Sequence, residues 1–237
     1  MSKAISDDEF TIAGSTIENI VLNNISLVRQ QKIILKQLNI ALSSEHFILM
    51  TGQNGSGKST LLKIMSGLLK PDSIIVNYQQ QSLFSRFWFM QKQFLREHFC
   101  YLHQTPYLFS GSVYDNIAYG LKHKKISRQQ QDYQVNQALK MVNLEHLSQR
   151  HSHALSGGER QRIAIARSWL IKPTFMLLDE PFANMDKHSR QTTYDILNQL
   201  KTENIGIIIT SHDAHNGELD FNRHLHLYQA GMTENSI

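Results

Sequence analysis

The segment TGQNGSGKST at residues 51–60 constrains the fold of this chain more than any other part of the sequence. It contains the pattern G-x-x-x-x-G-K-[S/T], preceded by the apolar run 46–50 and followed by the helical pattern LLKIMSGLL. Its glycines permit backbone conformations that point several N–H groups inward, and the N-terminus of the following helix adds positive potential. The sequence therefore predicts a strand, a phosphate-binding loop and a helix, in that order.

This loop is expected to bind the phosphates of a nucleotide together with Mg²⁺. The Lys58 ammonium can reach the β- and γ-phosphates, and the Ser59 hydroxyl can bind the metal ion. The expected binding residues are Gly52, Gln53, Asn54, Gly55, Ser56, Gly57, Lys58, Ser59 and Thr60.

Two further apolar runs, 175–178 and 207–209, lead into polar side chains. Both are typical of strands buried on two faces, and open parallel sheets carry their ligand-binding groups at the carboxyl ends of such strands. We expect Asp179 to hold Mg²⁺ directly or through water, and Glu180 to polarise the attacking water as a general base. His212 is expected to meet the γ-phosphate or that water. An acidic strand end leading into the Pro181 turn is the structural alternative for the two carboxylates.

The octet LSGGERQR at 155–162 leads into a predicted helix at 160–171, whose first residues it includes. Ser156, Gly157 and Gly158 can offer a hydroxyl and backbone N–H groups at the start of this helix, which would make a second anion site. Taken alone, the octet fits equally well a glycine turn followed by a solvated first helical turn.

Taken together, these segments resemble the ATP-binding-cassette (ABC) ATPases over nearly the whole chain. The resemblance implies an α/β fold: a P-loop NTPase with a mostly parallel RecA-like sheet, an N-terminal antiparallel β subdomain and an inserted α-helical subdomain. The strands of the β subdomain are expected at 17–28 and 33–42, the helical subdomain at about 105–168, and one nucleotide-binding domain over 1–237. The cofactors are then ATP and Mg²⁺, and each ATP lies between the loop of one copy and the octet of a second.

Other family positions carry over by sequence. Gln104 matches the glutamine that touches Mg²⁺ and water, Asp186 matches the aspartate of the dimer-contact loop, and His212 matches the switch histidine. The other residues of that contact loop, 183–185, depart from the family pattern. Arg29 stands about 23 positions before Gly52, where the family places an aromatic residue against adenine. Its guanidinium can stack on the base, and an exposed arginine without a ligand is the alternative.

The phrase SVYDNIAYGL at 112–121 is similar to bacterial importers, including those for oxyanions such as tungstate, molybdate and phosphate. The resemblance implies a second ATPase copy, transmembrane permease subunits and a substrate-binding protein as partners. It places the chain peripherally on the cytoplasmic face of the plasma membrane. Tyr107, Leu108 and Phe109 are candidate docking residues for the permease, with core packing as the alternative.

Composition limits the other classes of function. No apolar stretch approaches the ~18–20 residues that span a bilayer, and the polar, acidic start does not have the pattern of a signal peptide. The net charge is +4, but its basic residues are scattered, so no nucleic-acid partner is expected. Two rival functions remain open: a soluble ABC machine, for example in iron–sulfur cluster assembly, and a nucleotide sensor without turnover.

Two smaller patterns carry weaker expectations. The segment 82–99 mixes aromatic and basic residues, which can indicate membrane or nucleic-acid binding, but helix packing on the sheet is the simpler interpretation. Its apolar helical face comprises Phe84, Phe87, Trp88, Phe94 and Leu95. The alternating His224 and His226 are expected on an exposed strand face rather than in a metal site.

Overall fold

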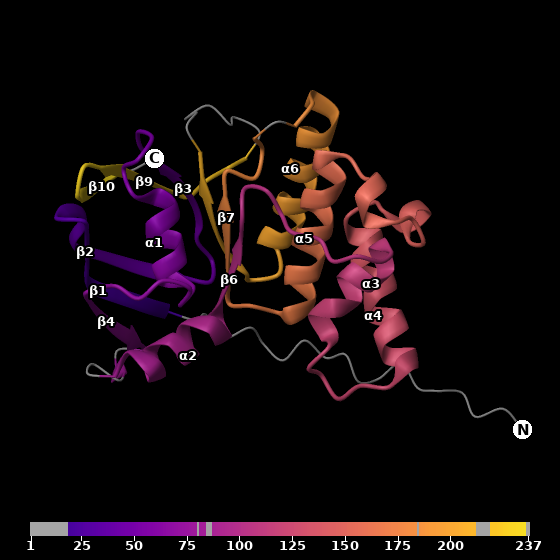
Figure 1. Ribbon diagram of the computed structural model, residues 1–237, viewed down its shortest axis with the longest axis horizontal. Coiled ribbons are helices and arrows are strands. Elements are labelled where there is room, and N and C mark those ends of the chain that lie inside the picture. The colour runs from indigo at the N-terminus through magenta and orange to yellow at the C-terminus, as the bar shows by residue number, and fades with distance from the viewer. Residues whose placement is uncertain (1–18, 80, 84–86, 184, 212–218, 236–237) are drawn as a thin grey trace, which may run out of the picture.

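Two β-sheets and the helices packed on them make up the part of the chain that the structure describes (Figure 1). The structure is a computed structural model, and it describes residues 19–79, 81–83, 87–183, 185–211 and 219–235. Within these ranges the central sheet has the order β10-β9-β3-β8-β7-β6, parallel except for β10. Its strands are β3 (Phe47–Thr51), β6 (Phe99–Leu102), β7 (Phe175–Asp179), β8 (Gly206–Thr210), β9 (Arg223–Tyr228) and β10 (Gly231–Asn235).

The central strands are buried on both faces, as their continuous apolar runs predict. Along β3, Phe47 and Leu49 pack into the core beneath the helices that follow β6, whereas Ile48 and Met50 pack into the core beneath the second sheet. β7 and β8 alternate in the same way. Two apolar layers therefore fix the carboxyl ends of β3, β7 and β8 side by side.

The second sheet is antiparallel, with the order β2-β1-β4-β5. Its first hairpin turns at Gln30 and Gln31, both in the left-handed region. The expected strands at 17–28 and 33–42 are confirmed with slightly shifted ends. The strands are β1 (Asn19–Arg29), β2 (Lys32–Ser43), β4 (Ser73–Tyr78) and β5 (Gln81–Leu83).

Helices cover both sides of the central sheet, and those of residues 113–171 gather away from the antiparallel sheet (Figure 1). α3, α4 and α5 each begin with a capping box, whose serine is Ser112, Ser127 or Ser156. The α-helices are α1 (Lys58–Met65), α2 (Trp88–His98), α3 (Val113–Ala118), α4 (Arg128–Met141), α5 (Gly157–Ile171) and α6 (Lys187–Lys201). Short 3₁₀ turns lie at η1 (Tyr119–Leu121), η2 (Glu145–Leu147) and η3 (Ser152–Ala154).

Two expectations about helices need correction. The pattern at 61–69 reads as helical throughout, but α1 ends at Met65 because Gly67 adopts a φ of 66°, which no helix continues. In α2, Leu95 is buried as expected, whereas the preceding Phe87 is 66% exposed. Phe84, on the same expected face, lies outside the described residues.

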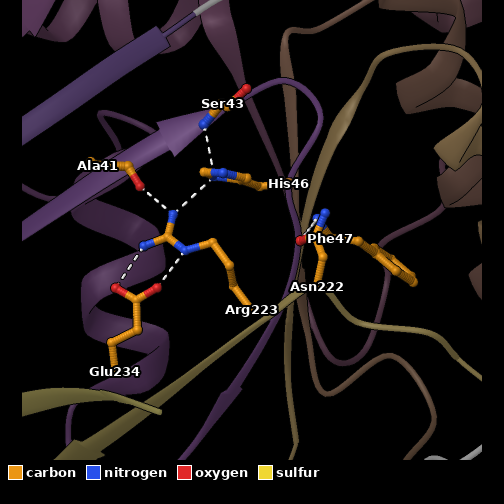
Figure 2. Close-up of polar contacts among 7 residues, drawn as sticks. All are labelled: Ala41, Ser43, His46, Phe47, Asn222, Arg223 and Glu234. Atoms are coloured by element: carbon orange, nitrogen blue, oxygen red, sulfur yellow. Dashed lines mark hydrogen bonds and ion pairs between the residues drawn. The ribbon is translucent and has the colours of Figure 1, made fainter. Parts of the chain in front are cut away.

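A polar cluster braces the base of β3 (Figure 2). The His46 Nδ1 atom accepts hydrogen bonds from the Ser43 N–H and from the Arg223 guanidinium, both at 2.9 Å. Arg223 also donates to the Ala41 carbonyl and to both carboxylate oxygens of Glu234, at 2.7 and 2.9 Å. The brace therefore ties β2 and the β2–β3 turn to β9 and β10 below the phosphate loop.

Candidate functional site

The phosphate loop connects β3 to α1 and is packed too closely for side chains at two of its glycines. A Cβ atom at Gly52 would lie 2.1 Å from the Leu227 carbonyl oxygen, and one at Gly57 would lie 3.0 Å from the Leu35 side chain. Both glycines also have positive φ, at 150° and 105°. The loop therefore packs against β9 at Gly52, where no side chain fits, and against β2 at Gly57, where the backbone conformation favours glycine.

Two polar side chains of the loop fit an anion. The Lys58 Nζ donates to the Gly52 carbonyl at 2.7 Å and to the Gln53 carbonyl at 3.3 Å, and the side chain is 5% exposed. Burial lowers the pKa of Lys58, against the opposing effect of the Glu180 and Asp179 carboxylates. The Ser56 hydroxyl is buried without a hydrogen-bond partner among the described residues. A phosphate group would supply the acceptor that the Ser56 hydroxyl lacks and a negative charge for the Lys58 ammonium, so the loop fits a nucleotide.

The carboxylate at the end of β7 is held by three hydroxyl groups. Asp179 Oδ1 accepts from Ser59 at 3.0 Å and from Thr210 at 2.8 Å, and Oδ2 accepts from the Tyr101 hydroxyl at 2.8 Å. Asp179 is 5% exposed, and burial together with this carboxylate raises the pKa of Tyr101. Carboxylate and hydroxyl oxygens are ligands that Mg²⁺ prefers, so the Ser59–Asp179 pair fits this metal.

Glu180 directly follows Asp179, and the backbone turns out of β7 at this residue. Its backbone has a φ of 48°, and its N–H donates to Thr210 Oγ1 at 2.9 Å. Its carboxylate accepts a hydrogen bond from Gln104 Nε2 at 3.2 Å. A left-handed backbone is costly for a glutamate, and such strain is typical of functional sites. The structure thus brings Ser59, Asp179, Glu180 and Gln104 together at one end of the sheet.

The predicted second anion site lies at the N-terminus of α5. Ser156 Oγ accepts from the Glu159 N–H at 3.2 Å, and Glu159 accepts from the Ser156 N–H at 2.7 Å. Although burial raises the pKa of Glu159, hydrogen bonds from the Ser156 N–H and hydroxyl, together with the charges of Arg150 and Arg162, lower it overall. A Cβ atom at Gly157 would meet nothing within 4 Å, whereas one at Gly158 would lie 2.6 Å from Ser189 Cβ. Gly157 therefore faces open space, and Gly158 packs on α6.

Asp186 connects this region to α6. Its carboxylate caps the helix, because it accepts from the Ser189 N–H at 2.9 Å and from the Ser189 hydroxyl at 2.7 Å. These bonds lower the pKa of Asp186. The same Ser189 contacts Gly158, so the cap and the glycine pair are held in a fixed relation.

Three further predicted positions are Arg29, Thr60 and His212. The Arg29 guanidinium donates to the carbonyls of Val28 and Lys70, at 3.0 and 3.1 Å, and pairs with Asp72 at 3.7 Å. Thr60 is half-buried in the first turn of α1. His212 and Asn184 lie outside the described residues.

Sequence reasoning assigned no role to Tyr101 or Thr210, which reach Asp179 from β6 and β8. The expectation that His224 and His226 lie on an exposed face is wrong. Both are half-buried, and their ring nitrogens lie 2.9 and 3.0 Å from the Thr51 hydroxyl below the loop.

An aromatic ledge lies beyond Gln104. Tyr107 is 72% exposed, and the Phe109 ring contacts the rings of Tyr107 and Tyr119 at centroid distances of 5.4 and 4.2 Å. Arg167 donates to the Tyr107 carbonyl at 3.1 Å, which holds the ledge against α5. Leu108 is half-buried and packs on the core. No helix in the described part of the chain is both long and apolar enough to cross a membrane.

Comparison with known sequences gives one family and many relatives. Residues 35–183 match the family model described as ABC transporter. The molybdate/tungstate import ATP-binding protein WtpC of Pyrococcus abyssi is 42% identical over 149 residues, which cover 62% of this chain and 41% of that protein. The sulfate/thiosulfate import ATP-binding protein CysA of Mesostigma viride is 37% identical over 199 residues, 82% of this chain and 55% of that protein. The chain thus spans about half the length of these two relatives.

A third relative is matched over most of its length. It is an ABC transporter ATP-binding protein of Clostridium acetobutylicum, 30% identical over 208 residues, with 86% of each chain covered.

Solved structures agree with the fold. CbiO1 of Clostridium perfringens, part of the ABC transporter complex CbiONQ, superimposes with a TM-score of 0.80 at 26% identity, covering 92% of this chain and 88% of that one. A dimeric ATP-binding cassette bound to ADP and Pi superimposes with a TM-score of 0.78 at 22% identity, covering 92% and 98%. The second likeness concerns the fold alone.

Proposed function

Since the chain belongs to the ABC transporter family, we propose that it hydrolyses ATP to power a membrane importer, with two copies closing head to tail on the nucleotide. The observation that carries the proposal is the convergence of the phosphate loop, Asp179 and the Glu180–Gln104 pair at one end of the central sheet.

In this proposal each side chain has one task. Lys58 leaves its own loop carbonyls for the β- and γ-phosphates, and the Ser59 and Asp179 oxygens would hold Mg²⁺ with Gln104. ATP would supply the reactive phosphoanhydride bond, and Mg²⁺ would offset the negative charge that develops on it. Glu180 accepts a proton from the attacking water, because its carboxylate lies beside Gln104 at the exposed end of the site. His212 is assigned to the γ-phosphate by family resemblance alone.

The second copy completes the site in this proposal. Ser156 and Gly157 stand at the start of a long helix, whose N-terminal N–H groups favour an anion, and Gly157 has open space before it. The γ-phosphate then provides the contact that favours the closed dimer, and its loss after hydrolysis removes that contact. Asp186 lies next to this surface and would face the partner copy.

Permease subunits would dock on the aromatic ledge at Tyr107 and Phe109. Exposed aromatic side chains of this kind commonly anchor protein interfaces. A substrate-binding protein and a peripheral position on the cytoplasmic face of the membrane complete the proposal. The named cargoes of the relatives include oxyanions, spermidine and ferric iron. Two of the three relatives described above are named for oxyanion import, so we favour an oxyanion as the cargo.

The variant Glu180→Gln tests the enzymatic part. It keeps the hydrogen-bonding shape of the side chain and removes the base, so we expect ATP-dependent dimers and phosphate release slowed by at least about a hundredfold. Glu145→Gln, on an exposed 3₁₀ turn, is the matched control and should behave as the parent. A Glu180→Gln protein with parental turnover would refute the assigned base.

Purification from solubilised membranes tests the transport part. Recovery of a polytopic membrane protein supports an importer. Recovery of soluble partners alone favours the rival soluble ABC machine.

A further inference from the structure

A pocket of about 360 Å³ opens beside the phosphate loop. Three segments line it: residues 53–56 of the loop, residues 32–34 at the start of β2, and residues 226–230 at the end of β9. Ser56, whose buried hydroxyl has no partner among the described residues, is one of the lining residues. The pocket is therefore continuous with the place where phosphates fit.

Tyr228 is one of the residues that line this pocket, and a neighbouring glycine fixes the position of its ring. Tyr228 ends β9 and is 49% exposed. It pairs with Gly231 of β10, and a Cβ atom at Gly231 would lie 2.3 Å from Tyr228 Cε2 and 2.4 Å from Cζ. The ring thus lies directly against the Gly231 backbone, in a space that exists because residue 231 has no side chain.

Apolar side chains continue the pocket toward the loop. Ile33 is 46% exposed, and Ile34 comes within 3.5 Å of a Cβ atom built on Gly57. An exposed aromatic ring beside two isoleucines, next to a phosphate cradle, matches the needs of a planar base attached to a phosphate chain.

The sequence pointed instead to position 29 for this task. The Arg29 guanidinium is engaged with the Val28 and Lys70 carbonyls and with Asp72, and Arg29 is not among the residues that line the pocket beside the loop. Among the described residues that line the pocket, the His226 ring is half-buried against Thr51, and the exposed ring is that of Tyr228.

We propose that the base of ATP stacks on the Tyr228 ring, in the pocket between the phosphate loop and the start of β2. The inference rests on the proposed ATP-binding function and adds the residue that holds the base. Because every base has a π-face, stacking on the ring does not by itself select one purine over another.

The test compares Mg²⁺-ATP with Mg²⁺-tripolyphosphate, which has phosphates but no base, by calorimetric titration of the full chain. For Tyr228→Ala the dissociation constant for ATP should rise about tenfold, as expected for a lost base–aromatic stack, while that for tripolyphosphate stays at the parental value. Tyr228→Phe keeps the ring and should bind both ligands as the parent does. Arg29→Ala tests the position that the sequence favoured. Because its guanidinium is engaged with two carbonyls and Asp72, this variant should bind ATP as the parent does.

A spectroscopic test checks the contact itself. Tyr228→Trp should show indole fluorescence that ATP quenches and tripolyphosphate does not. The signal of the two native tryptophans is measured in the parent protein and subtracted.

The possible outcomes separate the two proposals. A loss of ATP affinity in Arg29→Ala but not in Tyr228→Ala overturns the stacking proposal, and so does an equal loss for both ligands in Tyr228→Ala. A parent that binds tripolyphosphate as tightly as ATP overturns the stacking alone. A parent that binds neither ligand overturns the proposed function and this inference with it.

Discussion

Tyr101 holds Asp179 from a position that has no motif of its own. Its hydroxyl donates to Asp179 Oδ2 at 2.8 Å, and a hydrogen bond to a charged group contributes about 1.5–3 kcal/mol. Tyr101→Phe should therefore lower the free energy of unfolding by about that amount and raise the Mg²⁺ concentration needed for half-maximal ATPase activity. Urea unfolding and a Mg²⁺ titration measure both effects. Tyr133→Phe, at a 58% exposed position, is the control, and equal effects of the two variants would contradict the prediction.

Gly157 and Gly158 are adjacent in sequence but differ in the space around them. Gly158→Ala would place a methyl group 2.6 Å from Ser189 Cβ, so we expect a loss of about 1–3 kcal/mol in the free energy of unfolding. Gly157→Ala meets open space and adds a better helix former at the start of α5, so it should not destabilise the monomer. Thermal unfolding of the two variants measures the difference. Equal stability of the two alanine variants would show that Ser189 can move aside without cost, and it would contradict the prediction.

The sequence motifs predicted four of the side chains that lie together at the end of the central sheet. The strand register determines which further side chains contact them. Ser59, Asp179, Glu180 and Gln104 lie together as expected, because each follows or ends a buried parallel strand or its loop. Thr210 reaches Asp179 because β8 is paired with β7 at this register, a relation that no local pattern encodes.

The position of the Tyr228 ring also depends on which strands pair, and no local sequence pattern encodes that pairing. The position of Tyr228 beside the loop follows from the pairing of β9 with β3 and β10. The early end of α1 could have been predicted in part, because helices commonly end at a glycine such as Gly67, whose φ is positive.

We expect the brace below β3, which Figure 2 shows, to make the stability of the fold depend on pH. Burial and the neighbouring Arg223 lower the pKa of His46 from its ordinary 6.5, against the opposing effect of Glu234 and Glu45. Well above pH 6.5 the histidine is neutral in both the folded and the unfolded chain, and the stabilisation is complete. As the pH falls below that value the unfolded chain takes up the proton first, so the free energy of unfolding decreases, by up to about 1.4 kcal/mol per pH unit.

Urea unfolding between pH 5 and 8 tests the brace. His46→Asn keeps an acceptor near Nδ1 and cannot titrate, so its pH dependence should be shallower than that of the parent. Some slope should remain, because burial also lowers the pKa of His224. His146→Asn, on an exposed turn, is the control and should keep the parental slope. A parental slope in His46→Asn would exclude His46 as its source.

At the scale of the whole molecule, we propose that bound nucleotide holds two copies of the chain together. A ligand that binds only the folded dimer stabilises it by mass action, so the effect must grow with both ATP and protein concentration. In Glu180→Gln with Mg²⁺-ATP, the unfolding midpoint should rise as protein concentration is raised, and light scattering should give the mass of two chains. Without nucleotide the midpoint should be independent of protein concentration.

A second substitution separates dimer closure from simple ATP binding. Gly157→Asp, added to Glu180→Gln, places a negative charge at the first position of α5, where it suits the helix dipole of the monomer and repels a γ-phosphate held by the partner. This double variant should bind ATP and remain a single chain, because its own phosphate loop is untouched and only the surface offered to the second copy has changed. If it dimerised with ATP as Glu180→Gln does, the N-terminus of α5 would not be where the second copy grips the nucleotide.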